Sequence, residues 1–349
     1  MIRVMILSLA LSLAQSDPIA AQEAVTTFPA TADGPSVTMT LRSTTDTEIF
    51  APVLEAFVAA NPSVAIRYEQ WGSNALHAAT LADCMTGQGT TDAVISSGVH
   101  QMVDLVNRAC AQPYSSVLTQ ALPPARRWRN EVWGVTQEAA VTIYNRAMVP
   151  AADVPRSRFD LLDLMRREPE TYRDRIATYD IAASGLGDLF AFMDSQQATT
   201  FGGLLEGFAR VDAVATCCSA EIISGVASGR YLIAYNVLGS YLGADTADQV
   251  GVVAPQDYTL ILSRAFLIPR GAPQAGGAAR LLDFILSDRG QTILAENGLV
   301  RLADLPDQDL PDSARRPIPI APTLLVAMDQ ARRRIFLDTW RAAFDRSRP

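Results

Sequence analysis

The chain has 349 residues, 49% of them apolar and 19% charged, and it carries a formal net charge of −8 with a pI of about 4.9. This globular composition is long enough for two domains, and its negative charge argues against nucleic acid as a partner. All 29 basic residues are arginine and the only histidines are His77 and His100, which excludes lysine-based catalysis and leaves little material for a metal site, so we expect no metal and no cofactor.

Residues 1–21 are typical of a signal peptide. Arg3 precedes an apolar run that is too short to span a bilayer, and Ile19-Ala20-Ala21 fits the small-residue rule for cleavage. We therefore expect export to the periplasm, an oxidising compartment. Residues 22–36, which are polar and contain Thr, Pro and Gly, are predicted to be a loose lead-in.

Strands alternate with helices in the first part of the mature chain. Apolar residues between 49 and 58 recur at helical spacing, Thr45 and Glu48 have the form of a capping box, and Asn61-Pro62 ends this helix. The other elements predicted here are strands at 37–41, 64–68 and 92–96 and helices at 75–85 and 100–108. Such alternation predicts an α/β fold with a mostly parallel sheet.

The middle of the chain is bounded by two long extended stretches, 132–145 and 250–269. The elements predicted between them are a strand at 176–179, a strand followed by a turn at 231–242, and helices within 154–172 and at 186–194, 201–208 and 219–227. More helices are predicted at 275–287, 290–296 and within 318–344. Two crossings about a hundred residues apart indicate two discontinuous lobes with a ligand cleft between them.

The predicted division of the chain follows from these crossings. Lobe 1 takes residues 22–138 and 255–310, and lobe 2 takes residues 139–254. The helical segment at 311–349 is not assigned to either lobe.

Four cysteines allow three disulfide pairings. We favour Cys84 with Cys110, because both lie near the ends of consecutive predicted helices. Cys217 and Cys218 form either a vicinal disulfide or two buried thiols. Redox-active pairs more usually show C-x-x-C spacing, which argues against a redox function.

Two strand-to-helix turns are candidate anion sites. Ser43, Thr44 and Thr45 lie before one helix, and Ser184, Gly185 and Leu186 before another, one turn in each predicted lobe. Helix N-termini attract anions through their free N–H groups. Capping alone explains the first turn, and a tight turn alone explains the second. Together they predict two helix N-termini that face each other across the cleft.

Other polar residues follow predicted strands or lie near the second crossing. Each has a plain structural explanation: a turn at the serines, core packing at the tyrosines and asparagine, and a surface salt bridge at the arginine, which also suits bidentate recognition of an anion. The candidates are Ser96, Ser97, Tyr235, Asn236, Tyr241, Tyr258 and Arg264.

Several stretches spread over about residues 37–300 resemble the periplasmic solute-binding proteins of ABC transporters, in the branch with ferric-ion binders, hexose-phosphate binders and phosphoglycerate-transport regulators. The stretches are "STTDTEIFAPVLEAF", "DAVISSGVHQMVDLVNRACAQPY", "ATYDIAASGLGDLF", "GRYLIAYNVLGSYL", "DYTLILSRAFLIPRGAP" and "LLDFILSDRGQTILAENGL". The resemblance implies a two-lobed type II binding fold that closes at a hinge and performs no catalysis. It also implies that the turn at Ser184, Gly185 and Leu186 binds an anion, with contacts from Ser43 to Thr45 in the opposite lobe.

Our main hypothesis is a monomeric periplasmic receptor that delivers a small phosphorylated or carboxylated organic anion to an ABC permease. A ligand-sensing co-receptor for a membrane sensor kinase would use the same fold. A ferric-ion binder is disfavoured, because ferric binders of this branch use two adjacent tyrosines, whereas Tyr235 and Tyr241 are six residues apart. An enzyme is disfavoured, because no G-x-S-x-G, H-E-x-x-H or zinc-site spacing occurs.

Overall fold

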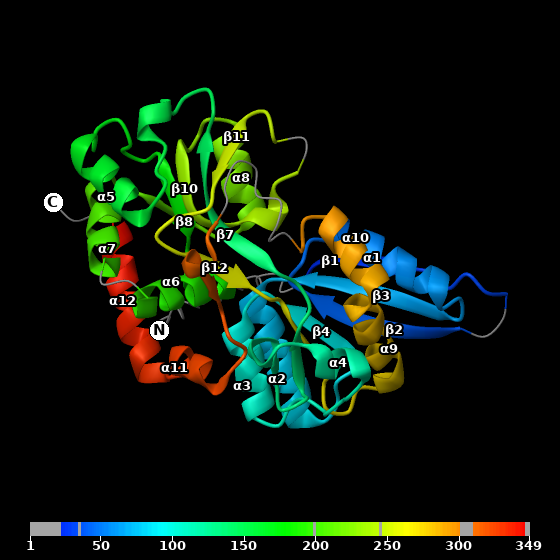
Figure 1. The fold of residues 1–349 in the computed structure, drawn as a ribbon. Coiled ribbons are helices and arrows are strands. Elements are labelled where there is room, and N and C mark those ends of the chain that lie inside the picture. The colour runs from blue at the N-terminus through cyan, green and yellow to red at the C-terminus, as the bar shows by residue number, and fades with distance from the viewer. Residues whose placement is uncertain (1–21, 34–35, 198–199, 244–245, 301–309, 346–349) are drawn as a thin grey trace, which may run out of the picture.

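The computed structural model describes residues 22–33, 36–197, 200–243, 246–300 and 310–345 (Figure 1). The predicted signal peptide at 1–21 lies outside the described residues. Within the described ranges, no helix is both long enough and apolar enough to cross a membrane.

The first lobe is built on a sheet with the strand order β1-β3-β2-β4-β13-β6-β5. Its strands are β1 (Gln22–Phe28), β2 (Val37–Ser43), β3 (Val64–Trp71), β4 (Ala93–Ser96), β5 (Arg127–Trp128), β6 (Val132–Gly134) and β13 (Ala265–Leu267). Its helices are α1 (Thr47–Ala60), α2 (Ser73–Thr86), α3 (Val99–Asn107), α4 (Val117–Ala121), α9 (Ala275–Leu286) and α10 (Asp288–Glu296). The central strands β3, β2 and β4 are parallel, as the strand–helix alternation predicts.

The second lobe is built on a sheet with the order β14-β12-β7-β10-β8-β9, in which β11 also pairs with β7. Its strands are β7 (Glu138–Asn145), β8 (Ile176–Tyr179), β9 (Val214–Thr216), β10 (Ile233–Leu238), β11 (Val250–Val253), β12 (Thr259–Leu262) and β14 (Arg315–Pro317). Its helices are α5 (Arg158–Arg167), α6 (Gly185–Gln197), α7 (Phe201–Arg210) and α8 (Ser219–Ala227). A short 3₁₀ turn, η3 (Gly239–Tyr241), follows β10.

The chain passes between the sheets at residues 135–137 and again at residues 263–264, which confirms the fold class with two hinge crossings. Strand β12 still pairs with β7, so the return to the first lobe begins after Leu262 and not at residue 255. The pairing continues because this stretch is apolar and all of β12 is buried.

The C-terminal segment contacts both lobes. Strand β14 pairs with β12, α11 (Leu325–Met328) packs against α3 of the first lobe, and α12 (Gln330–Phe344) packs against α7 of the second lobe. In Figure 1 this segment runs in orange and red along one side of the molecule. On α12, Trp340 and Phe336 stack against Phe201 of α7.

Helix α1 shows how the apolar pattern builds the core. Its buried residues Phe50, Val53, Leu54, Phe57 and Val58 repeat every three to four positions, so one face of the helix packs on the first sheet. Burying each large side chain stabilises the fold by about 1.5–3 kcal/mol. A separate cluster joins residues of α3 to residues of α6, so the two lobes pack directly against each other.

Two local predictions are wrong. The lead-in at 22–36 contains β1, which pairs antiparallel with β3 from Gln22 to Phe28; its threonines favour a strand at a sheet edge. The expected capping box is also absent. Helix α1 begins at Thr47 with Asp46 as its N-cap residue, no side chain caps it, and the Thr45 hydroxyl is bonded elsewhere.

Candidate functional site

A cleft of about 510 Å³, its open mouth included, lies between the two lobes. Its lining from the first lobe includes Glu23, Thr44, Asp46, Trp71, Gly72, Ser73 and Ser97. Its lining from the second lobe includes Tyr179, Ser184, Leu186, Cys217, Cys218, Ser219, Ala220 and Tyr241. The structure therefore brings Thr44, Ser97, Ser184, Leu186 and Tyr241 together, from turns far apart in the sequence.

Helix N-termini converge on this cleft. Helices α1, α2 and α8 begin directly after the lining residues Asp46, Gly72 and Cys218, and α6 begins after Ser184. Helix α3 begins two residues after Ser97. Each N-terminus carries a partial positive charge, so their convergence favours a negative ligand group. The first-turn amides are not all free, since the Gly185 amide of α6 and the Thr47 amide of α1 donate to Ser73 and Gln70.

On the first lobe, Thr44 and Ser97 are joined to each other. The Ser97 amide donates to Thr44 Oγ1 at 2.9 Å, and the two hydroxyls lie 3.1 Å apart. Behind them Ser43 Oγ accepts from the Thr45 amide, and Ser96 Oγ accepts from the Gly98 amide, both at 3.0 Å. Ser43, Thr45 and Ser96 are buried and do not line the cleft; they hold the loops that present Thr44 and Ser97.

On the second lobe, Ser184 caps α6 by accepting a hydrogen bond from the Gly187 amide at 3.1 Å. The Gly185 amide, which was expected to face a ligand, donates to Ser73 Oγ of the first lobe at 2.8 Å. Asn74 Nδ2 also donates across the gap, to the carbonyls of Ala182 and Ala183, each at 3.0 Å. The lobes are thus closed on each other at the N-termini of α2 and α6.

Gly185 allows the close approach of the two lobes in this arrangement. A Cβ atom there would lie 2.8 Å from the Gln101 amide group and 2.9 Å from Ser73 Oγ, both on the first lobe. Sequence reasoning missed Ser73 and Asn74. The signal was present, because Gly72-Ser73-Asn74 follows a strand and opens a helix, as Ser43-Thr44-Thr45 does.

Tyr235, Asn236 and Tyr258 do not line the cleft. All three donate hydrogen bonds to the buried Asp194 carboxylate, at 2.6, 2.6 and 2.7 Å. Arg158, which is 1% exposed, pairs with the same carboxylate at 3.1 Å. This network holds α5, α6 and β10 together inside the second lobe, so these side chains have an internal role.

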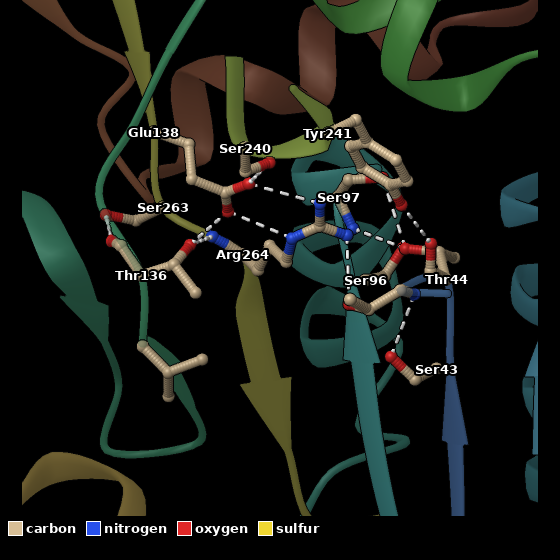
Figure 2. A network of polar contacts seen from close by, with 12 residues as sticks. Ser43, Thr44, Ser96, Ser97, Thr136, Glu138, Ser240, Tyr241, Ser263 and Arg264 are labelled. Atoms are coloured by element: carbon tan, nitrogen blue, oxygen red, sulfur yellow. Dashed lines mark hydrogen bonds and ion pairs between the residues drawn. The ribbon is translucent and has the colours of Figure 1, made fainter. Parts of the chain in front are cut away.

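Arg264 is also outside the cleft lining, at the hinge, as Figure 2 shows. Its guanidinium is 0% exposed and donates to both Glu138 oxygens, at 2.9 and 3.1 Å, and to Thr45 Oγ1 at 2.9 Å. Ser240 and Thr136 donate to the same carboxylate. Burial alone would lower the pKa of Arg264, but the Glu138 carboxylate raises it, so the guanidinium keeps its charge.

These residues form a hinge cluster, defined here as Thr45, Thr136, Glu138, Ser240 and Arg264. Thr136 lies in the first crossing, Arg264 in the second, and Thr45 and Ser240 in the two lobes. The surface salt bridge considered for Arg264 from its sequence position is wrong, because Arg264 forms a buried ion pair with Glu138. Direct contact between Arg264 and a ligand is corrected to a positioning role, since the guanidinium is enclosed by these partners.

Two carboxylates, Glu23 and Asp46, line the cleft, and no arginine does so among the described residues. Gln70 Nε2 donates to both, at 3.0 and 3.3 Å, and Tyr241 OH lies 3.4 Å from Asp46 Oδ1. Burial raises the pKa of Asp46, against the opposing charge of Arg264 and with the help of Glu23. Tyr241 joins the lobes, because its hydroxyl also lies 3.4 Å from the carbonyl of Thr44.

Metal-ligand geometry is not formed by the described side chains: they contain no group of three or more His, Cys, Asp or Glu placed to hold an ion. The two tyrosines considered for a ferric site are also separated. Tyr241 lines the cleft, whereas Tyr235 is directed into the second lobe toward Asp194.

Both disulfides are present. Cys84 on α2 is bonded to Cys110 after α3, with 5.4 Å between the Cα atoms, which confirms the favoured pairing. Cys217 is bonded to its neighbour Cys218, and this vicinal disulfide lines the cleft where α8 begins.

A family model described as bacterial extracellular solute-binding protein matches residues 53–302. The substrate binding protein of the ABC transporter from Agrobacterium tumefaciens is 29% identical, with a TM-score of 0.85 over 93% of this chain and 99% of that chain. Iron-bound HitA from Pseudomonas aeruginosa is 16% identical, with a TM-score of 0.66 over 88% of this chain and 99% of that chain. The ferric binding protein from Campylobacter jejuni is 15% identical, with a TM-score of 0.66 over 87% and 99%. At such low identity these two show the fold alone, and no curated protein matches the chain.

Proposed function

Because the chain belongs to the family of bacterial extracellular solute-binding proteins, we propose that it is the substrate-binding component of an ABC transporter. Its ligand is a small phosphorylated or carboxylated organic anion, held in the interlobe cleft. Its place of action is the periplasm, where it meets the permease as a monomer. The lobes follow the division by sheets, with lobe 1 ending near Gly134 and resuming near Ala265.

The convergence of helix N-termini is the observation that carries this proposal. Helices α1, α2, α3, α6 and α8 point their positive ends at one cleft that has no basic side chain among its described lining residues. An anion placed there gains about 0.3–1 kcal/mol from each helix dipole, and up to about 2 kcal/mol where the geometry is partly buried. Oriented backbone N–H groups therefore take the place of arginine or lysine in this site.

The carboxylates of Glu23 and Asp46 refine the ligand class. Neither has an ion-pair partner among the described residues, and both lie on the first lobe. A ligand with only negative groups would meet these carboxylates unfavourably, whereas hydroxyl or ammonium groups donate hydrogen bonds to them. The ligand we propose is therefore an organic anion that also carries hydrogen-bond donors, and not a bare inorganic ion.

Closure couples binding to transport. A ligand that touches Thr44 and Ser97 on one lobe and Ser184 and Ser219 on the other stabilises the closed arrangement, because it bonds both lobes only in that state. The hydrogen bonds from Ser73 and Asn74 across the gap add to closure. The permease then meets a closed surface that differs from the open one.

The proposal is tested by native mass spectrometry of protein purified without refolding, followed by calorimetry with the molecule that is identified. We expect a bound organic anion, and a rise in unfolding free energy of about 2.7 kcal/mol at a hundredfold excess over Kd. Thr44→Val and Ser97→Ala should each weaken binding roughly tenfold or more. Ser228→Ala, at the far end of α8, is the matched control and should leave binding unchanged. Stabilisation by Fe³⁺ and by no organic anion would sink the proposal.

A further inference from the structure

The vicinal disulfide Cys217–Cys218 has an unusual position in the cleft. It lies between β9 and α8, both cysteines are exposed, and both line the cleft together with Ser219 and Ala220. The other disulfide is buried in the first lobe, where Cys84 is 7% and Cys110 is 0% exposed. A soluble dithiol therefore has access to one disulfide and not to the other.

Cys218 is also the N-cap residue of α8. Helices are usually capped by Ser, Thr, Asp or Asn, whose side-chain oxygens accept a hydrogen bond from the first turn. No side chain caps α8 in this way. The first turn of α8 therefore directs N–H groups toward the cleft that are not used by a capping side chain, which suits a ligand anion.

The bond between adjacent cysteines restricts the backbone where β9 turns into α8. The neighbouring Ser219 is 7% exposed, and its hydroxyl lies 2.6 Å from Tyr179 OH. Tyr179 in turn accepts a hydrogen bond from the Leu238 amide at 3.2 Å. Contacts with the sheet thus hold the body of α8 in place, while the disulfide determines the direction in which the N–H groups of its first turn point.

We propose that the Cys217–Cys218 disulfide holds the first turn of α8 in its anion-binding geometry, so that reduction of this bond releases the turn and weakens anion binding. The inference rests on the proposed function, because it concerns the same cleft. In the reaction a dithiol donates two electrons and two protons. The sulfur–sulfur bond breaks, Cys217 and Cys218 become thiols, and the dithiol becomes a disulfide.

The test compares oxidised protein with protein treated with a mild dithiol, using calorimetry with citrate and with glycerol 3-phosphate as probes, since both are organic anions that carry hydroxyl donors. Thiol titration of the native protein should find the two sulfurs of Cys217 and Cys218 after treatment, while Cys84–Cys110 stays oxidised. We expect the Kd of the bound probe to rise roughly tenfold or more on reduction. The variant Cys217→Ala/Cys218→Ala should show no response to the dithiol. An unchanged Kd in the reduced wild type, or an equal response in the variant, would overturn the inference.

Amide hydrogen exchange separates this inference from the proposed function. Reduction should speed exchange at residues 219–222 and leave exchange in α3 unchanged. If neither probe binds in either state, the anion class is wrong for these probes, and the exchange rates decide the inference. Unchanged rates at 219–222 would then overturn it, and faster rates would support it.

Discussion

The buried ion pair of the hinge cluster allows a prediction whose size follows from the structure. Arg264→Met removes a guanidinium that makes three side-chain hydrogen bonds, to Glu138 and Thr45, and leaves the Glu138 carboxylate without a counter-charge at 0% side-chain exposure. Breaking one side of a buried pair costs about 3–5 kcal/mol, because the remaining charge stays buried. Glu138→Leu should cost a similar amount for the same reason.

The double variant Arg264→Met/Glu138→Leu distinguishes this explanation from simple loss of packing. It removes both charges together, so it should lose about 3 kcal/mol less than the sum of the two single variants. The measurement is urea unfolding followed by tryptophan fluorescence, with the free energy extrapolated to water. Arg210→Met breaks a single exposed pair with Glu206 and is the control, with an expected cost of at most about 1 kcal/mol. Additivity within about 0.5 kcal/mol would refute the reasoning, because coupled charges cannot behave as independent sites.

Three more predictions concern closure, pH and the buried disulfide. Gly185→Ala should hold the lobes apart and increase the radius of gyration in small-angle scattering, because its Cβ would lie 2.8 Å from a first-lobe side chain. Gly202→Ala is the control and should not change the radius, because no atom lies within 4 Å of its Cβ. Equal radii for the two variants would contradict this account. Burial raises the pKa of Asp46 above its usual 3.8, so the folded state binds the proton more tightly, and stability falls as pH rises from 3.8 through the raised pKa. Asp46→Asn should remove this part of the pH dependence of thermal unfolding. An unaltered pH profile in the variant would contradict the prediction. Cys84→Ser/Cys110→Ser should lower the free energy of unfolding by about 3.5 kcal/mol, because the disulfide closes a loop between cysteines 26 residues apart and so limits the entropy of the unfolded chain. Urea unfolding measures this loss. A loss near zero would contradict a structural role for this disulfide.

Helices and strands were predicted well where the apolar pattern of the local sequence is enough to identify them. Strand β8 and helix α8 have the predicted bounds, and Gly229, which follows the C-cap of α8, has a positive φ of 75°, as is typical of a glycine after a helix. Strand β1 was missed, because an edge strand with few apolar residues looks like a loop until its partner β3 is known. Local sequence records periodicity, but it does not record the partner that completes a sheet.

The candidate site was predicted in part. The turns that carry Thr44, Ser97 and Ser184 do line the cleft, because a strand-to-helix turn presents its residues at the sheet edge wherever it occurs. Tyr235 and Arg264 are polar residues near the same turns, yet their partners are internal carboxylates. Whether a polar side chain faces a ligand or a buried partner depends on contacts between distant segments.

The C-terminal segment ties the lobes together a third time, since α11 packs on one lobe and α12 on the other with only Asp329 between them. A connection of one residue is short, so the two lobes can separate only as far as this connection between α11 and α12 allows. Spin labels placed on the two lobes at the edge of the cleft should therefore report an upper limit to the distance between the lobes. Cleavage of the chain between α11 and α12 should remove that limit.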